Sequence, residues 1–344
     1  MNVSYLFVIL FLIYMLILVM YVLYSKSFNT KFNDQRIKLA KKTNKYFLDY
    51  KKKPYEQTDL VSYMFFLTSS LNEDAKKSKN YLLLDYNISY PRVFKTDASH
   101  IIKLTDALAQ IMLLNLSNST IIIKFLLSSY KKNQIKFTIS VWANKNFAKE
   151  CKKVENIHIC MSEKSREFYR FAKKLASEND SEIRFDFETQ ESIKISTDIT
   201  LELSETKVDI LKKLKIRMDN KFTALIAESN PYAFSILKND LEFMGIDVKP
   251  TSDWDIIKRH VEDTIFSPNI IFVQAKLLKS VDIEEIKTSL IEKNIPLVII
   301  QNDDRCIKID PKIYVEYLTQ PYTSDALISI LNNTHEYRCS KNQN

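Results

Sequence analysis

One strand-like segment of the chain ends in a residue that is poorly suited to the chemistry its place favours. Residues Ile270 to Val273 form an unbroken apolar run, and Gln274 follows directly in NIIFVQAKLL (269–278). In open sheets of parallel strands, ligands and reacting groups lie just beyond the carboxyl ends of the strands. A carboxylate there would serve as nucleophile, general base or metal ligand. The amide of Gln274 is poor in all three roles.

The cysteines and histidines give weaker chemical signals. The four cysteines are Cys151, Cys160, Cys306 and Cys339, and the four histidines are His100, His158, His260 and His335. The cysteines are too few and too scattered for a disulfide scaffold. Cys151, His158 and Cys160 are close in sequence, but three ligands at this spacing are a weak zinc signal, and ordinary thiols are the simpler interpretation. The histidines are interpreted as surface or hydrogen-bonded residues, so we expect no metal site and no catalytic residue.

Glycine usage excludes two classes of nucleotide site. The 344 residues include one glycine, Gly245. Phosphate-binding loops need glycine, because only glycine lets backbone N–H groups approach phosphates in positive-φ conformations without strain. The Walker A loop and the dinucleotide-binding GxGxxG loop are therefore excluded. The length suggests two or three domains.

The first segment is apolar enough to cross a membrane. Residues Val3 to Tyr24 are almost wholly apolar and carry no charge, which matches the length needed to span a bilayer. A cleaved signal peptide would need a basic region and a small-residue cleavage site, and neither is present. Tyr5, Tyr21 and Tyr24 lie near the ends, as interfacial aromatic residues do. We expect a transmembrane anchor over residues 1–25.

A strongly basic segment follows the apolar one. Residues 25–54 contain ten Lys or Arg and two acidic residues. The excess of basic over acidic residues in this segment therefore equals the net charge of the whole chain, +8. The positive-inside rule then places the C-terminal bulk in the cytoplasm. The same segment can bind anionic lipid, and its position beside the span favours this over nucleic-acid binding. We expect a basic juxtamembrane helix over residues 26–56 and no nucleic-acid partner.

The central part of the chain has an α+β pattern. Residues 81–88 predict a strand, and Asp97 is placed to cap a helix over residues 98–116. Two strands, 119–129 and 134–142, are joined at YKKN as a hairpin. A helix over residues 163–179 precedes two more strands, 182–188 and 192–203, and residues 204–220 predict a charged helical linker.

The C-terminal part changes to β-α repeats. Strand-like segments FTALIAE, IDVKPT, NIIFVQ, PLVIIQ and VEYLTQP alternate with helical ones, and Gly245 is placed to end the first helix. This pattern predicts a doubly wound, five-stranded parallel sheet.

These repeats resemble the receiver domain of two-component signalling proteins over about residues 221–333. The segments ALIAESNP, NIIFVQAKLL, IPLVIIQN and EYLTQPYTSDAL are similar to its functional strand ends. Receivers use an acidic pair for Mg²⁺, an aspartate that accepts phosphate, a hydroxyl that senses it and a lysine that pairs with it. The resemblance implies that the corresponding positions are Glu228 and Ser229, Gln274, Gln301 and Gln320. Only Glu228 keeps its chemistry, so the resemblance implies a pseudo-receiver.

The central part resembles the ATP-binding domain of histidine kinases. VFKTDASHIIKLTDALAQI is similar to its asparagine-bearing helix, and residues 165–203 are similar to its last helix and hairpin. A gapless alignment places Ile111 where the family has its Mg²⁺-binding asparagine, whereas a shifted register would use Asn115 or Asn118. VWANKNF has no aspartate for the adenine and MSEKSREF has no lid glycine. No histidine precedes His100, so the phosphoacceptor hairpin is also missing.

Together these features predict a degenerate hybrid histidine kinase that acts by binding. The expected domains are an ATPase-like two-layer sandwich over 57–203, a linker over 204–220, a pseudo-receiver over 221–335 and a tail over 336–344. We expect a single-pass protein of the bacterial inner membrane that needs no cofactor and serves as a scaffold or regulator. Its expected partners are two-component proteins or a membrane assembly, possibly with a second copy of itself. The alternatives are a divergent active sensor kinase using ATP and Mg²⁺, and a basic nucleic-acid binder.

A partner face is expected around residues 312–327 of the receiver-like part. In active receivers, which this part resembles, the last strand and its flanking helices form the docking face. The segment carries Tyr314, Tyr317 and Tyr322, and tyrosine is a favoured interface anchor. The alternative is that all three tyrosines pack beneath flanking helices.

Overall fold

The computed structural model describes residues 56–149, 154–187, 191–204, 210–216, 222–251, 254–263, 265, 267–279, 281–302, 307 and 309–342. The predicted membrane anchor and all but the last residue of the predicted basic helix lie outside these ranges. No helix within the described ranges is long and apolar enough to cross a membrane. Residues 53–344 cluster as one compact unit, which contains two folds, here named the α+β domain (residues 56–204) and the α/β domain (residues 222–342).

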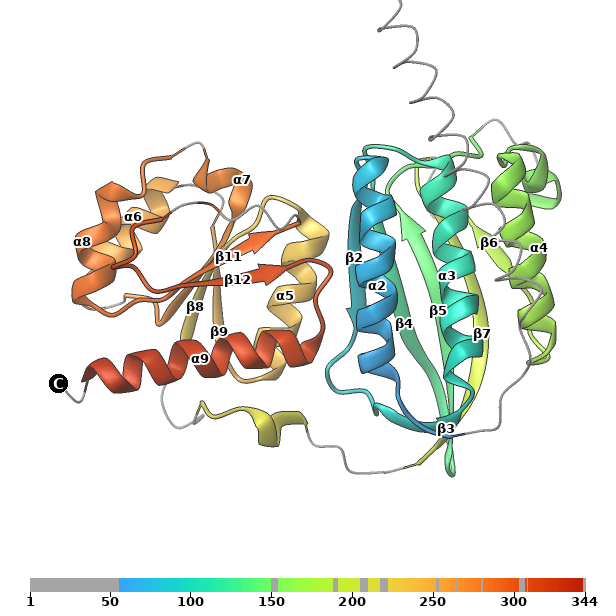
Figure 1. The fold of residues 1–344 in the computed structure, drawn as a ribbon, viewed down its shortest axis with the longest axis horizontal. Helices are drawn as coiled ribbons and strands as arrows, with labels where there is room; N and C mark the ends of the chain where they lie inside the picture. Colours follow the sequence, from blue (N-terminus) through green and yellow to red (C-terminus); the bar gives the residue numbers. More distant parts are fainter. Residues whose placement is uncertain are drawn as a thin grey trace, which may run out of the picture. The chain divides into compact units, whose positions relative to one another are not determined.

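The α+β domain is one sheet with helices on one face (Figure 1). Its described strands form a seven-stranded sheet in the order β1-β3-β7-β5-β4-β2, with β6 paired to β7. The strands are β1 (Glu56–Asp59), β2 (Tyr81–Tyr86), β3 (Val93–Thr96), β4 (Thr120–Lys131), β5 (Gln134–Ala143), β6 (Arg184–Asp186) and β7 (Ile193–Leu203). The helices are α2 (Leu60–Lys77), α3 (Ala98–Asn115) and α4 (Glu163–Ser177), with a 3-10 turn at Val154–Ile159.

Local signals in the sequence explain the ends of these elements. The side chain of Asp97 accepts a hydrogen bond from the backbone N–H of Ser99 at 3.0 Å, which caps α3 as predicted. The hairpin between β4 and β5 turns at Lys132, whose φ of 55° gives the left-handed conformation that this turn needs. The predicted hairpin at YKKN is therefore confirmed.

The α/β domain is a parallel five-stranded sheet with helices on both faces. The strand order is β12-β11-β10-β8-β9, and neighbouring strands are parallel. The strands are β8 (Thr223–Ala227), β9 (Asp247–Pro250), β10 (Ile270–Gln274), β11 (Leu297–Gln301) and β12 (Val315–Thr319). The helices are α5 (Pro231–Phe243), α6 (Trp254–Glu262), α7 (Ala275–Leu278), α8 (Glu284–Glu292) and α9 (Ser324–Asn342).

Two cores hold this domain together. Helices α5 and α9 supply Leu237, Leu241 and Leu331 to the core on one face, and α6 and α8 supply Ile257 and Leu290 to the other. The central strands are therefore apolar on both faces, as buried parallel strands are. Gly245 has a φ of 77° immediately after α5, where the predicted helix end requires a positive φ.

Several features differ from the sequence-based expectations, and strands β1 and β3 are among the elements that were not predicted. Helix α2, whose buried face includes Leu60, Met64 and Leu71, was not predicted. The described part of the expected linker helix contains only a 3-10 turn at Ile210–Lys213. The described part of the expected tail is helical, because α9 continues through Asn342. Within it, Tyr337 stacks on Tyr314 and Arg338 donates a hydrogen bond to the Asn269 carbonyl at 2.8 Å.

Candidate functional site

The candidate site lies at the carboxyl edge of the parallel sheet. The register pairs Val273 with Ala227 on one side and with Ile299 on the other, so the strand ends are level. Gln301 is paired with Thr319 on the next strand. This alignment brings together five residues that the sequence predicted for one site: Glu228, Ser229, Gln274, Gln301 and Gln320.

The side chains of this edge bind one another. The Ser229 hydroxyl donates a hydrogen bond to Oε1 of Gln274 at 2.7 Å. Nε2 of Gln301 donates to the Thr319 hydroxyl at 3.3 Å, and the backbone N–H of Gln320 donates to the Gln301 carbonyl at 2.8 Å. Gln274, at the end of β10, thus holds a hydroxyl as a neutral acceptor.

Glu228 is the carboxylate of this group of five, and it is already engaged. It is 7% exposed, its Oε1 accepts a hydrogen bond from the backbone N–H of Asn230 at 2.8 Å, and its Oε2 accepts one from the Tyr81 hydroxyl at 3.4 Å. Burial raises the pKa of Glu228, and these hydrogen bonds only partly oppose it. Mg²⁺ in phosphoryl-transfer sites is held by carboxylates together with substrate phosphates. Within the described ranges, no cluster of three His, Cys, Asp or Glu residues is placed to hold a metal ion.

Gln320 is buried with its amide unsatisfied. The residue is 1% exposed, and within the described part of the chain neither its Nε2 nor its Oε1 has a hydrogen-bond partner. An unpaired buried polar group costs about 1–3 kcal/mol. Within the described residues, the Gln320 side chain therefore has no hydrogen bond that offsets its burial.

Replacing Gln320 by methionine is expected to raise the free energy of unfolding by about 1 kcal/mol, because methionine keeps the shape and removes the unpaired amide. Urea unfolding followed by circular dichroism measures the change. Gln301→Met is the comparison variant, and a smaller gain is expected there because Nε2 of Gln301 is hydrogen-bonded. A loss of stability in Gln320→Met would show that the amide makes favourable contacts.

Tyr81 of the α+β domain reaches the same edge. A cavity of about 590 Å³ lies beside its side chain, and its lining includes Ser229, Gln274, Lys276 and Gln301. Burial and the charge of Glu228 raise the pKa of Tyr81, while hydrogen bonds involving Gln274 and Asn302 oppose the rise. The sequence analysis did not identify Tyr81, because nothing in its local sequence distinguishes it from other strand tyrosines.

The predicted nucleotide residues do not form an open site. Ile111 is fully buried in the core face of α3. Nδ2 of Asn115 donates hydrogen bonds to the Ile111 carbonyl and the Ser165 hydroxyl, both at 2.6 Å. Its Oδ1 accepts one from the backbone N–H of Ser162 at 2.9 Å. Asn115 therefore ties the end of α3 to the start of α4. Asn118 is exposed in a turn, with a φ of 49°.

The histidine and cysteine candidates His100 and Cys160 each contribute to the structure of the α+β domain. His100 Nε2 lies 3.1 Å from the Leu175 carbonyl oxygen, so this histidine links α3 to α4. Cys160 is disulfide-bonded, which removes the thiolate that a zinc site would need. The interpretation of Cys160 as an ordinary thiol is therefore wrong.

The three tyrosines of the expected partner face have different environments. Tyr322 is 6% exposed, and its hydroxyl donates a hydrogen bond to Oδ2 of Asp240 at 3.2 Å. The Tyr317 hydroxyl donates to the Ile307 carbonyl at 3.1 Å. The Tyr314 ring stacks on Tyr337 with centroids 4.2 Å apart. Tyr322 is thus a core residue in this structure, and a partner face at Tyr314 and Tyr317 stays a prediction.

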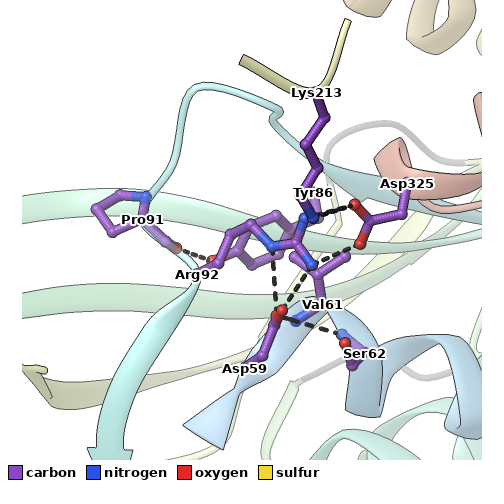
Figure 2. A network of polar contacts seen from close by, with 8 residues as sticks. All are labelled: Asp59, Val61, Ser62, Tyr86, Pro91, Arg92, Lys213 and Asp325. Carbon is purple, nitrogen blue, oxygen red and sulfur yellow. Dashed lines mark hydrogen bonds and ion pairs between the residues drawn. The ribbon is translucent and has the colours of Figure 1, made fainter. Parts of the chain in front are cut away.

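A buried arginine joins the two domains, and the sequence analysis missed it as well (Figure 2). The Arg92 side chain is 3% exposed. Its Nη2 donates to Oδ2 of Asp59 at 2.6 Å and to Oδ2 of Asp325 at 2.5 Å. Its Nη1 donates to Oδ1 of Asp325 at 2.9 Å. Asp59, Arg92 and Asp325 are named the Arg92 clamp. Lys213 adds an ion pair to Asp325 at 3.1 Å.

Comparison with known proteins confirms both folds. No family model matches the chain, and no curated protein is similar to it in sequence. Among solved structures, full-length ShkA in complex with AMPPNP matches with a TM-score of 0.59 at 8% identity, covering 81% of this chain. The chain spans 57% of the length of ShkA.

Two further solved structures are similar to parts of the chain, with lower TM-scores. The catalytic domain of the histidine kinase ThkA gives a TM-score of 0.35 at 14% identity, with 44% of this chain and 99% of that domain covered. A receiver domain protein from Bacillus halodurans gives a TM-score of 0.28 at 15% identity, with 33% and 97% covered. The described chain therefore has the fold of a histidine kinase ATP-binding domain followed by the fold of a receiver, as in a hybrid histidine kinase.

Proposed function

We propose that this protein is a membrane-tethered, catalytically inactive member of the two-component type that works by binding other proteins. The observation that carries the proposal is Gln274, whose amide lies at the end of β10 and accepts the Ser229 hydroxyl at 2.7 Å; the resemblance to receivers makes this the phosphoacceptor position. Phosphoryl transfer to a receiver requires a carboxylate as acceptor, and an amide does not replace it.

The α+β domain supports the same conclusion. Asn115 is committed to the junction of α3 and α4 through Ser165 and Ser162, and Ile111 is enclosed in the core. Neither side chain is available to coordinate a metal–nucleotide complex. Two folds without their chemistry leave their surfaces as the useful property, so a scaffold or regulator for signalling proteins is the function that the residues favour. The apolar and basic N-terminal residues supply the proposed membrane anchor and lipid contact.

Incubation with acetyl phosphate and Mg²⁺ is expected to add no phosphoryl group to the purified full-length protein, because neither an acceptor carboxylate nor an acidic pair is present. Intact-protein mass spectrometry measures the incorporation, with an active receiver treated in parallel. The Gln274→Asp variant should also stay unmodified, since Ser229 and Gln320 still lack the required charges.

A phosphoryl group on the unmodified chain would contradict the proposal. Saturable binding of a fluorescent ATP analogue that is lost in Asn118→Ala would favour the alternative of a divergent, active kinase. Unchanged analogue fluorescence in both proteins is the expected result.

A further inference from the structure

Tyr81 lies beside Glu228 and Gln274 at the carboxyl edge of the receiver-like sheet. Its hydroxyl lies 3.4 Å from Oε2 of Glu228, and it also interacts with Gln274 and Asn302. These three residues are at or just beyond the carboxyl ends of β8, β10 and β11. A side chain from the α+β domain is therefore bound where a receiver would hold its phosphoryl group.

The position of Tyr81 is fixed by backbone pairing. Its N–H donates to the Ser119 carbonyl at 2.8 Å, and β2 runs parallel to β4 from this residue onward. Side chains alternate along a strand, so Tyr81 and Leu83 share the outer face of the sheet. Leu83 packs with Ile122 against Ala233 of α5. The ring of Tyr81 is thus held at the α/β domain by a rigid strand.

The chemistry of the edge suits a phenol better than a phosphoryl group. A phosphoryl group would add negative charge close to Glu228, with neutral Gln274 and Gln320 in place of the acceptor and the lysine. A phenol instead offers an apolar ring and one hydroxyl, which donates to the carboxylate. Gln274 and Asn302 add two neutral amides beside the hydroxyl, whereas Lys276 and Lys279 line the adjoining cavity.

Further contacts fasten the same two surfaces. Nδ2 of Asn72 donates to the Gln320 carbonyl at 3.1 Å, and Nδ2 of Asn230 donates to the Thr120 hydroxyl at 3.0 Å. The rings of Trp142 and Tyr232 meet with centroids 4.7 Å apart. Each pair joins one residue of the α+β domain to one of the α/β domain. Tyr81 is therefore surrounded by further contacts between the two domains.

We propose that the carboxyl edge of the receiver-like sheet is a binding site for a tyrosine side chain, and that Tyr81 of the same chain is its ligand. This rests on the proposed function in one respect, namely that the edge takes no phosphoryl group. The α+β domain then closes this edge to outside partners for as long as Tyr81 stays bound.

Hydrogen–deuterium exchange of the full-length protein tests the proposal. Tyr81→Ala is expected to accelerate amide exchange about tenfold in peptides covering residues 228–231 and 274–279, because the ring that covers them is removed. Tyr81→Phe should show a smaller acceleration in the same peptides, since it loses only the hydroxyl. Tyr130→Phe is the matched control, because Tyr130 is 57% exposed on the β4–β5 hairpin.

Chemical rescue separates the phenol site from a general loss of packing. Added p-cresol should restore protection in Tyr81→Ala, whereas toluene, which lacks the hydroxyl, should restore less. Unchanged exchange in both Tyr81 variants, or equal rescue by toluene, would overturn the phenol site and leave the proposed function standing. Incorporation of a phosphoryl group into the wild-type chain would instead contradict the proposed function. Intact-protein mass spectrometry measures that incorporation in a separate experiment.

Discussion

Replacement of Arg92 by methionine is expected to lower the free energy of unfolding by about 3 kcal/mol, because it leaves two carboxylates without their shared cation. Arg92 donates to Asp59 and Asp325 through its terminal nitrogens, and its side chain is 3% exposed. The two aspartate side chains are 35% and 36% exposed, which keeps the expected loss at the low end for a buried pair. Urea unfolding followed by circular dichroism measures it.

Arg184 supplies a matched control for the Arg92 clamp. It also binds an aspartate through two nitrogens, with distances of 3.0 and 2.7 Å to Asp198, but its side chain is 46% exposed. Arg184→Met should therefore cost at most about 1 kcal/mol. Equal losses in the two variants would contradict a special role for the Arg92 clamp.

The Arg92 clamp also predicts how acid acts on the contact between the domains. Burial alone would raise the pKa of Asp325, but hydrogen bonds from Arg92 and Lys213 outweigh it, and the pKa is lowered. A carboxyl group with a lowered pKa in the folded state stabilises above its unfolded pKa, and this contribution is lost as the pH falls through the folded value. The loss in Arg92→Met should accordingly shrink below about pH 4, where Asp325 is increasingly protonated in the unfolded state.

Asp240→Asn is expected to raise the free energy of unfolding by on the order of 2 kcal/mol at pH 8, because a carboxylate there is costly to ionise. Burial raises the pKa of Asp240 to about 7, the Tyr322 hydrogen bond opposes the rise, and the charge of Asp85 adds to it. The Tyr322 hydroxyl donates to Asp240 at 3.2 Å, and an asparagine oxygen can accept the same bond.

The sign of the pH dependence follows from the raised pKa of Asp240. The folded state holds a proton on this group up to about pH 7, whereas the unfolded chain releases it near pH 4. Stability contributed by the protonated group is therefore complete below about pH 4 and is lost as the pH rises through 7. Unfolding curves between pH 4 and pH 8 should show this decline in the wild-type protein and not in Asp240→Asn.

Asp247→Asn is the control for Asp240. Asp247 belongs to the same domain but is exposed, so its replacement should change the free energy of unfolding at pH 8 by less than about 0.5 kcal/mol. A parallel slope in wild-type protein and Asp240→Asn would show that Asp240 ionises as an ordinary surface carboxylate.

Local patterns predicted most of the secondary structure. Asp97 caps its helix and Gly245 ends another, because capping groups and positive-φ positions act within a few residues. Helix α2 shows why the prediction was incomplete. Tyr63 is 42% exposed and Phe66 is 70% exposed, so apolar residues on the outer face obscure the periodicity on which such a prediction depends.

The candidate site, like the secondary structure, could be predicted only in part from the sequence. The sequence by itself determined that residues 274, 301 and 320 carry amides and that the chain contains one glycine. It thereby determined which phosphate-binding loops are excluded, because these properties belong to the covalent structure and need no partner.

Only the tertiary structure decided what those residues contact. Tyr81 and Glu228 are 147 positions apart, and Arg92 and Asp325 are 233 positions apart. The raised pKa of Asp240 likewise comes from burial and from Asp85, a residue of the other domain. Burial and electrostatic pairing depend on which surfaces meet when two domains pack, and no local pattern of residues encodes that meeting.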